Sequence, residues 1–483
     1  MVKKLKSEWL NQPGINILAG IVVALALIPE ALAFSIIAGV DPMVGLYAAF
    51  IIATVTAIIG GRPAMISGAT GAVALLVTPL VKDYGVEYLF AATILMGLIQ
   101  LTLGILKVGR LMKFIPRSVM IGFVNALGIM IFMAQIKHIF GISISTYIYV
   151  IITLLIVYII PRFFKAIPAT LIAIVVLTAF YMYTGSDVRT VGDLGSIKQT
   201  LPHFLFPNVP FNLETLQIIF PYSLSMAIVG LVESLLTAKI VDDATDTYSS
   251  KNKESRGQGI ANLITGFFGG MGGCAMIGQT LINVKSGANS RLSTFTAGIV
   301  LIFMVIVLGG VVIQIPMPIL AGIMVMVSLG TIDWNSFKYI KKAPKTDAIV
   351  MVLTVIIVLM THNLAIGVVV GVIFSALFFA TKISKVEVVY EDLGKKHLFS
   401  FKGQIFFVSI DSMMEQIDLN IEDSIIELNF NHAHLWDDSA VDAIDTIVRK
   451  FEEKNNIVYV EKLNADSRKI VSEISQLNEN HLN

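Results

Sequence analysis

Long hydrophobic runs alternate with short polar connections over residues 1–384 of the chain. We distinguish fourteen such runs, and several are long enough to cross about 30 Å of hydrocarbon as helices. This pattern predicts a polytopic α-helical membrane protein with fourteen transmembrane segments. The runs lie near 15–37, 43–59, 69–81, 88–106, 116–136, 147–160, 168–184, 216–238, 257–271, 275–285, 292–314, 317–330, 346–361 and 363–381.

The third and tenth runs are short and follow stretches rich in small residues. The third follows MISGATG at 65–71, and the tenth follows GGMGGC at 269–274. Each Gly destabilises a helix interior by about 1 kcal/mol relative to Ala, and irregular backbone at membrane depth must be buried in protein or line a polar cavity. We predict two half-helices whose N–H groups and positive dipole ends face an anionic solute. The alternative is close helix packing through small residues.

Basic residues are distributed unevenly between alternate connections. With the N-terminus in the cytoplasm, all but four of the Lys and Arg residues up to Lys385 fall on the cytoplasmic side. Because cytoplasmic loops have the excess of basic residues, this asymmetry supports fourteen spans. Seven spans per half is an odd number, which predicts two inverted repeats at about 10–185 and 215–384.

After Lys385 the apolar runs end, and short segments of strand and helix character alternate. Their β-branched and aromatic content predicts strands, and the apolar period of 438–453 predicts a helix. The segment 385–483 is therefore expected to form a cytoplasmic α/β domain. The strands are expected at 386–392, 398–410, 424–430 and 455–460, and the helices at 412–417, 438–453 and 466–476.

The amino-acid composition agrees with a large membrane part and a smaller α/β domain, and it restricts the classes of function to consider. Of the 483 residues, 55% are hydrophobic and 14% are charged, and the mean hydropathy is +0.80. The net charge of +1 gives no reason to expect nucleic acid, and the single cysteine, Cys274, excludes a disulfide framework. Because the sequence contains no metal-ligand cluster, Walker loop or nucleophile elbow, we expect no cofactor, no metal, no ATP-driven pump and no enzyme.

Two acidic residues stand inside apolar runs. Glu233 lies in MAIVGLVESLLTAKIV, and Glu30 lies in PEALAF. A charged side chain at the bilayer centre costs at least about 2.5 kcal/mol, so such a residue is a candidate for cation coupling. The alternative for Glu233 is a structural carboxylate paired with Lys239 or a backbone N–H. For Glu30 it is a neutral hydrogen bonder.

Three motifs in this order resemble the sulfate permease family of anion transporters over essentially the whole chain. They are PEALAFSIIAGVDPMVGLYAAF (29–50), GLVESLLTAK (230–239) and GCAMIGQTLINVKSGANSRLS (273–293). The C-terminal domain resembles a STAS domain, similar to anti-sigma factor antagonists. The resemblance implies a seven-plus-seven inverted repeat with a core and a gate domain. It also implies elevator-like movement and an anion held between the N-termini of the third and tenth helices.

The same resemblance suggests which residues act. Many animal members have an arginine where this chain has Gln279, so Gln279 either hydrogen-bonds the anion or joins two helices. Members with a carboxylate at Glu233 use it for coupling, to sodium where it is aspartate and to protons in the similar plant LVES motif. Thr237 matches a sodium-ligand position, and most relatives have glutamine at Glu30. The implied anion site comprises Ala69, Thr70, Gly71, Ala275, Met276 and Ile277.

In the C-terminal domain, Asp438 and Ser439 stand where anti-sigma antagonists have an aspartate and a phosphorylatable serine. A phosphate on Ser439 would be stabilised by the following helix dipole. We favour the simpler interpretation that Asp437, Asp438 or Ser439 caps the helix.

The expected function is secondary transport of an inorganic oxyanion, sulfate first, coupled to protons. Sodium-coupled bicarbonate transport and proton-coupled dicarboxylate transport are alternatives, and an anion channel and a nucleobase permease are alternatives of other classes. The expected setting is the plasma membrane, where the chain is multi-pass. The N-terminus and the STAS-like domain are then cytoplasmic, and the chain forms a homodimer as relatives with STAS domains do.

Overall fold

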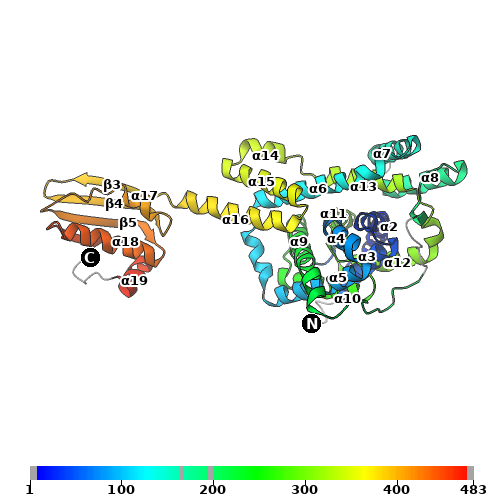
Figure 1. Cartoon of the computed structure of the whole chain (residues 1–483), viewed down its shortest axis with the longest axis horizontal. Helices are drawn as coiled ribbons and strands as arrows, with labels where there is room; N and C mark the ends of the chain where they lie inside the picture. Colours follow the sequence, from blue (N-terminus) through cyan, green and yellow to red (C-terminus); the bar gives the residue numbers. More distant parts are fainter. Residues whose placement is uncertain (1–7, 164–167, 194–199, 476–483) are drawn as a thin grey trace. The chain divides into compact units, whose positions relative to one another are not determined.

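The computed structural model describes residues 8–163, 168–193 and 200–475. It divides into two compact units, Met1–Val372 and Ile373–Asn483, each described by itself below (Figure 1). The division falls inside helix α16 (Leu364–Ile383). The predicted domain boundary at 384/385 stays a prediction.

The first unit is helical, and each of the fourteen predicted apolar runs falls on a helix. The short helix α14 (Ser336–Lys342) and the two 3₁₀ segments were not expected. The elements are α2 (Pro13–Ala38), α3 (Pro42–Ile59), β1 (Ser67–Ala69), α4 (Gly71–Tyr84), α5 (Val86–Ile105), η1 (Val108–Phe114), α6 (Arg117–Ile139), α7 (Ile144–Phe163), α8 (Ala169–Thr184), η2 (Val191–Asp193), α9 (Leu213–Thr245), α10 (Lys251–Phe267), β2 (Gly273–Ala275), α11 (Ile277–Lys285), α12 (Arg291–Val312), α13 (Met317–Thr331), α14, α15 (Lys345–Thr361) and α16.

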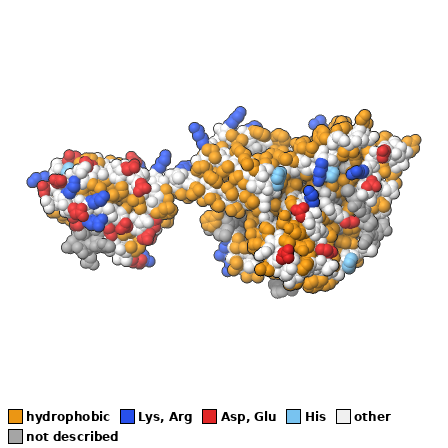
Figure 2. Space-filling view, in the orientation of Figure 1, with side chains coloured by type: hydrophobic (Ala, Val, Ile, Leu, Met, Phe, Trp, Pro, Cys, Tyr) orange, Lys and Arg blue, Asp and Glu red, His pale blue; other side chains and the backbone are white. Residues whose placement is uncertain are grey.

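Within the described residues, nine helical stretches are long and apolar enough to cross a membrane. The half-helices α4 and α11 are shorter than this, as the sequence predicts. Figure 2 shows hydrophobic side chains over most of the visible face of this unit. These features identify a helical membrane protein, while the number of fourteen crossings stays a prediction.

Two helix boundaries differ clearly from the expectation. Helix α9 extends from the Asn212 cap to Thr245, beyond the apolar run 216–238. Helix α10 begins at Lys251 after the Ser250 cap, rather than at 257, and ends at Phe267 before Gly269, whose φ is +72°. The physical reason is that hydropathy marks the apolar part of a helix, whereas caps and left-handed residues mark its ends.

Helices α5 and α10 pack closely along one another through glycines on both sides. A Cβ placed on Gly259 would lie 2.5 Å from the backbone nitrogen of Leu101, and one on Gly97 would collide with Leu263. Such small-residue contacts let two backbones approach in a membrane protein. Both helices of this pair also contact α9.

The second unit contains a four-stranded sheet in the order β3-β4-β5-β6. Strands β3 and β4 are antiparallel, while β4, β5 and β6 are parallel. Helix α18 packs on β5 and β6 and contacts α17 and α19. The elements are β3 (Glu387–Asp392), β4 (Lys396–Ile405), α17 (Ile410–Met414), β5 (Ile425–Leu435), α18 (Asp438–Glu452), β6 (Ile457–Glu461) and α19 (Ala465–Ile474).

The predicted order of strands and helices in this unit agrees with the structure, but some bounds differ: β5 runs on to Leu435, beyond the predicted end at 430. Strand β4 ends at Ile405, so 406–410 is not strand, and helix α17 begins at Ile410 instead of 412. The hydroxyl of Ser409 accepts from Phe406 N–H and donates to Phe406 O, which closes a turn between the two elements. A hydroxyl that bonds locally to backbone competes with the strand ladder.

Candidate functional site

A two-stranded ribbon joins the two Gly-rich stretches of the sequence. Strands β1 and β2 pair antiparallel, with Ser67 opposite Ala275 and Ala69 opposite Gly273. A Cβ on Gly273 would collide with Gly68 O, so glycine is required here. The two segments predicted to be unwound are thus short extended strands that pair with each other. Both strands are fully buried.

Each strand of the ribbon leads directly into a half-helix. Thr70 is the N-cap of α4 and Met276 is the N-cap of α11, and neither side chain bonds to its helix. Neither helix has an acidic residue in its first turn. Because the first N–H groups of a helix lack intrahelical acceptors, both helices begin with donors and positive dipole ends at this ribbon.

Two of the backbone donors assigned to the anion from the sequence already have partners. Ala275 N–H donates to Ser234 Oγ at 3.0 Å, and Met276 N–H donates to Ile66 O at 2.9 Å. The donors left for an anion therefore belong to the first turns of α4 and α11, which begin at Gly71 and Ile277.

Buried amides hold the ribbon in place. Asn262 on α10 donates to Gly273 O at 3.0 Å and accepts from Gly273 N–H at 2.9 Å, while it also donates to Gln100 Oε1. On the other strand, Gln258 donates to Ser67 Oγ at 2.7 Å. Asn262 and Gln258 are fully buried, so these bonds form without competition from water.

Glu233 is linked to the ribbon through Cys274. The thiol of Cys274 donates to Glu233 Oε2 at 3.0 Å, and its sulfur lies 3.1 Å from Thr70 Oγ1. Because a thiol has one proton, the Thr70 hydroxyl is the donor in the second contact. Glu233 is buried in the middle of α9. The result is a chain of side chains from the N-cap of α4 to an intramembrane carboxylate.

Thr237 lies one turn after Glu233 on the same helix. Its hydroxyl donates to the backbone oxygen of Glu233 at 2.7 Å, and the side chain is buried. Since the proton of the hydroxyl is used within the helix, the lone pairs of its oxygen remain for a cation.

Glu30 and Gln279 form a second polar pair beside α11. Gln279 Nε2 donates to Glu30 Oε1 at 2.6 Å, joining the first turn of α11 to α2. Gln279 is buried, and its Oε1 atom has no hydrogen-bond partner among the described residues. Of the two roles considered for Gln279, the interhelical bond is present, and it leaves an acceptor and a second amide N–H available.

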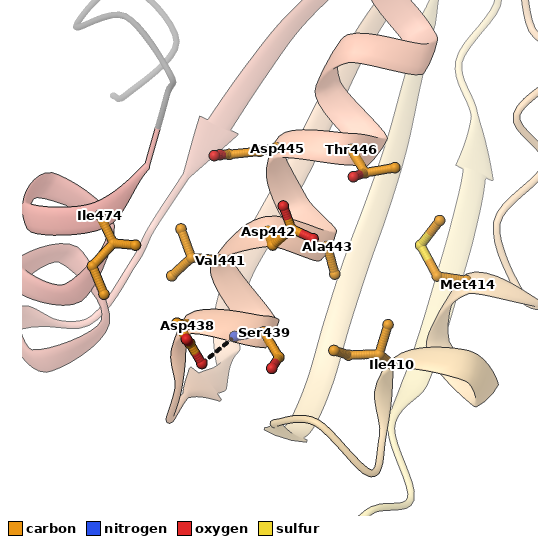
Figure 3. Close-up of a pocket in the computed structure, with 10 residues that line it drawn as sticks. All are labelled: Ile410, Met414, Asp438, Ser439, Val441, Asp442, Ala443, Asp445, Thr446 and Ile474. Atoms are coloured by element: carbon orange, nitrogen blue, oxygen red, sulfur yellow. Dashed lines mark hydrogen bonds between the residues drawn. The ribbon is translucent and has the colours of Figure 1, made fainter.

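In the second unit, Ser439 lines a cavity of about 560 Å³ between α17, α18 and α19 (Figure 3). Asp437 is the N-cap of α18 and accepts from Ala440 N–H at 3.0 Å, while Asp438 accepts from Ser439 N–H. The interpretation that Asp437 caps this helix, one of the three capping residues considered from the sequence, is thus confirmed. Asp438, Asp442 and Asp445 surround the same cavity and would repel a phosphate on Ser439.

The sequence motifs do not assign a role to Ser234 or Cys274. Ser234 stands next to Glu233, and the two form one polar stretch of an apolar helix. This adjacency is the sequence feature that could have identified Ser234. Nothing local marks the contact between Cys274 and Glu233, which lie 41 positions apart.

The chain matches the model of the sulfate permease family over residues 15–158 and 143–354. It is 55% identical, over 98% of its length and 99% of the other protein, to "Putative sulfate transporter YbaR" of Bacillus subtilis (strain 168). It is 27% identical to "Bicarbonate transporter BicA" of Picosynechococcus sp., over 77% of this chain and 71% of that protein.

Two solved structures have a similar fold. The transmembrane domain of a cyanobacterium bicarbonate transporter, BicA, superimposes with a TM-score of 0.65 at 26% identity, covering 75% of this chain and 96% of that chain. Murine Solute Carrier 26 family member A9, an anion transporter in the inward-facing state, gives a TM-score of 0.84 at 17% identity, over 97% of this chain and 89% of that chain. At that identity the second comparison shows the fold alone.

Proposed function

Because the chain belongs to the sulfate permease family, we propose that it is a secondary active transporter of an inorganic oxyanion, sulfate first. Family membership makes it a multi-pass anion transporter rather than an enzyme. We propose the plasma membrane as its location, with the N-terminus in the cytoplasm.

The observation that supports this proposal is the convergence of two uncapped half-helices on one ribbon. The first turns of α4 and α11 offer backbone donors, and neither turn contains an acidic residue of its own. Each dipole contributes at most about 2 kcal/mol in a partly buried geometry. An anion held this way is bound weakly enough to be released, as a transporter requires.

For the coupling ion we propose a proton, with Glu233 as its carrier. Two half-helix dipoles of roughly half a charge each offset one negative charge but not two. A divalent anion therefore leaves excess negative charge, to which an ionised Glu233 would add. Protonation of Glu233 removes this repulsion, and the Thr70–Cys274–Glu233 chain brings the carboxylate into contact with the ribbon.

Sodium-coupled bicarbonate transport is the second candidate. It is favoured by the similarity to BicA proteins, which are named as bicarbonate transporters, and by Thr237, whose oxygen could join Glu233 as a cation ligand. Glu30, bonded to Gln279, is the next carboxylate that could take the coupling role in either case.

We propose fourteen spans arranged as two inverted repeats, with α4 and α11 in equivalent places. The ribbon supports this, because each repeat supplies one strand and one half-helix to the same site. Movement of a core domain against a gate domain, in the manner of an elevator, would then expose the ribbon to either side. Residues 385–483, which lie in the second unit, are proposed to form a cytoplasmic STAS domain that contacts its counterpart in a homodimer.

Uptake of labelled sulfate and bicarbonate into proteoliposomes tests the proposal. We expect sulfate uptake that accelerates under an inward proton gradient and does not depend on sodium. Bicarbonate uptake that requires sodium would replace the first candidate by the second. Uptake of neither anion under any gradient would contradict both.

Deletion of the residues after Lys385 tests the division of labour between the two units. All proposed site residues lie in the first unit, so the shortened protein should bind anion with unchanged affinity once folded and inserted. It should form fewer dimers, as measured by light scattering in detergent. Loss of binding in a correctly folded deletion protein would contradict the placement of the site.

A further inference from the structure

A polar cavity of about 550 Å³ lies in the first unit, separate from the ribbon. It is formed by Glu8 before α2, by the connections from α3 to β1, from α9 to α10 and from α11 to α12, and by the starts of α10 and α12. The lining residues are Glu8, Gly61, Arg62, Pro63, Ala64, Thr245, Thr247, Tyr248, Ser250, Lys253, Ala288, Asn289 and Arg291.

The charged side chains of this cavity are mostly basic. Arg62, Lys253 and Arg291 line it, against the single carboxylate of Glu8. Hydroxyl and amide groups make up most of the remaining polar lining, and these can donate to an oxyanion. The lining therefore has three basic side chains and one acidic side chain.

Arg62 and Arg291 are built into the wall rather than lying on the surface. Their side chains are 8% and 3% exposed, and Arg62 is paired with Asp242 while Arg291 is paired with Glu8. Arg291 also donates to the backbone oxygens of Ala57 and Gly60. Both guanidinium groups are thus held in place before any ligand arrives, which lowers the entropic cost of binding.

Arg62 keeps donor capacity that no described residue uses. Its Nη1 donates to Asp242 and Thr247, and its Nη2 donates to Thr245, but its buried Nε has no hydrogen-bond partner among the described residues. Burial also lowers the pKa of Arg62 from its ordinary value, with Asp242 acting in the opposite direction. A second anion nearby would compensate this buried charge.

The acidic groups around the cavity are already engaged. Asp242 accepts from Arg62, Lys251 and Ser249. Glu254 accepts from the backbone N–H groups of Gly61 and Arg62. Lys253, in the first turn of α10, is an exposed side chain of the cavity lining.

We propose that this cavity binds a phosphate group, through Lys253 together with the fixed guanidinium of Arg62. Arg and Lys are the side chains that hold phosphate in proteins, and their charge-assisted bonds are about twice as strong as neutral ones. The connection that contains Arg62 leads directly into β1. A bound phosphate therefore ties the start of the ribbon to the α9–α10 connection, whichever anion the ribbon transports.

The phosphate group has two possible sources, a free anion and the headgroup of an anionic phospholipid. The experiment uses the full-length protein in nanodiscs of phosphatidylcholine, to which either inorganic phosphate or phosphatidylglycerol is added. The melting temperature is followed by intrinsic fluorescence. A rise with inorganic phosphate identifies a free anion, and a rise only with phosphatidylglycerol identifies a headgroup.

Lys253→Gln is the test variant, and Lys338→Gln, an exposed lysine of α14, is its matched control. The control removes the same charge away from the cavity. We expect the concentration of the effective probe needed for half of the stabilisation to rise about tenfold in Lys253→Gln and to stay unchanged in Lys338→Gln. No stabilisation by either probe would overturn the proposal. So would an equal response of both variants and the unchanged protein, because a phosphate at the ribbon would not sense Lys253.

Discussion

The thiol of Cys274 in strand β2 donates a hydrogen bond to Glu233 Oε2 in the middle of α9, over 3.0 Å. The same sulfur contacts Thr70, the N-cap of α4. One side chain of the strand that leads into α11 therefore contacts both Glu233 and the cap of α4. This contact gives a physical route by which a proton and an anion can influence each other's binding.

The first prediction concerns Glu233→Gln, which mimics the protonated side chain. It should retain anion binding, because repulsion is absent, yet lose the acceleration of uptake by an inward proton gradient. Proteoliposome uptake with and without the gradient measures this. Glu30→Gln is the control and should keep the response. If Glu233→Gln keeps it and Glu30→Gln loses it, the coupling role belongs to Glu30.

The second prediction tests whether an anion occupies the N-terminus of α11. Gly278 lies in the first turn of α11, and a Cβ placed there meets no atom within 4 Å. Gly278→Leu should fill this space without disturbing the fold and weaken anion binding at least tenfold, about 1.4 kcal/mol. Gly310→Leu in α12 is the matched control, since Gly310 also faces open space within a helix.

Isothermal titration with sulfate measures both variants of the second prediction. Equal affinities for the two variants would place the anion away from α11. Substitution at Gly71 is less informative, because a Cβ there would lie 2.9 Å from Phe34 and force repacking.

The third prediction concerns Asn262→Ala and tests whether the Asn262 amide stabilises the ribbon. The change leaves Gly273 N–H and Gly273 O without their partner, and each buried group left unpaired costs on the order of 1–3 kcal/mol. We expect a lower melting temperature and weaker sulfate binding together. Asn335→Ala, at an exposed position before α14, should change neither. Normal binding in Asn262→Ala would mean that the ribbon forms without the amide.

The fourth prediction is a pH dependence in the second unit. The hydrogen bond from Lys396 holds the pKa of the Glu427 carboxyl below its ordinary value. A carboxyl with a lowered folded-state pKa stabilises the fold above its unfolded pKa, and this contribution is lost as pH falls through the folded pKa. Because Lys396 is half exposed, the effect should be small.

Hydrogen exchange of the β4 and β5 amides, compared between the unchanged protein and Glu427→Gln at each pH, measures the fourth prediction. The two proteins should differ at neutral pH and converge in acid. A difference that is constant with pH would show that the carboxylate contributes by packing alone.

How much of this fold the sequence predicts depends on whether the signal is local. The apolar runs and the glycines before α4 and α11 are local, and they predict the helices and the two half-helices. The pairing of Ser67 with Ala275 is a contact between distant parts of the chain, and three-residue strands of small residues have no alternating pattern to mark them. For the same reason the sequence identifies Glu233 as a candidate but not its partner Cys274.

The ribbon also sets an order of events during synthesis. Strand β1 emerges with the first repeat, but the only strand it pairs with among the described residues, β2, is made after α10. Until then the backbone groups of Ser67–Ala69 lack the partners that hydrocarbon cannot supply. The segment Ser67–Ala69 of the first half therefore stays incompletely folded until the second half has been synthesised. A nascent chain that stops before Gly273 should present this segment to chaperones and proteases as unfinished.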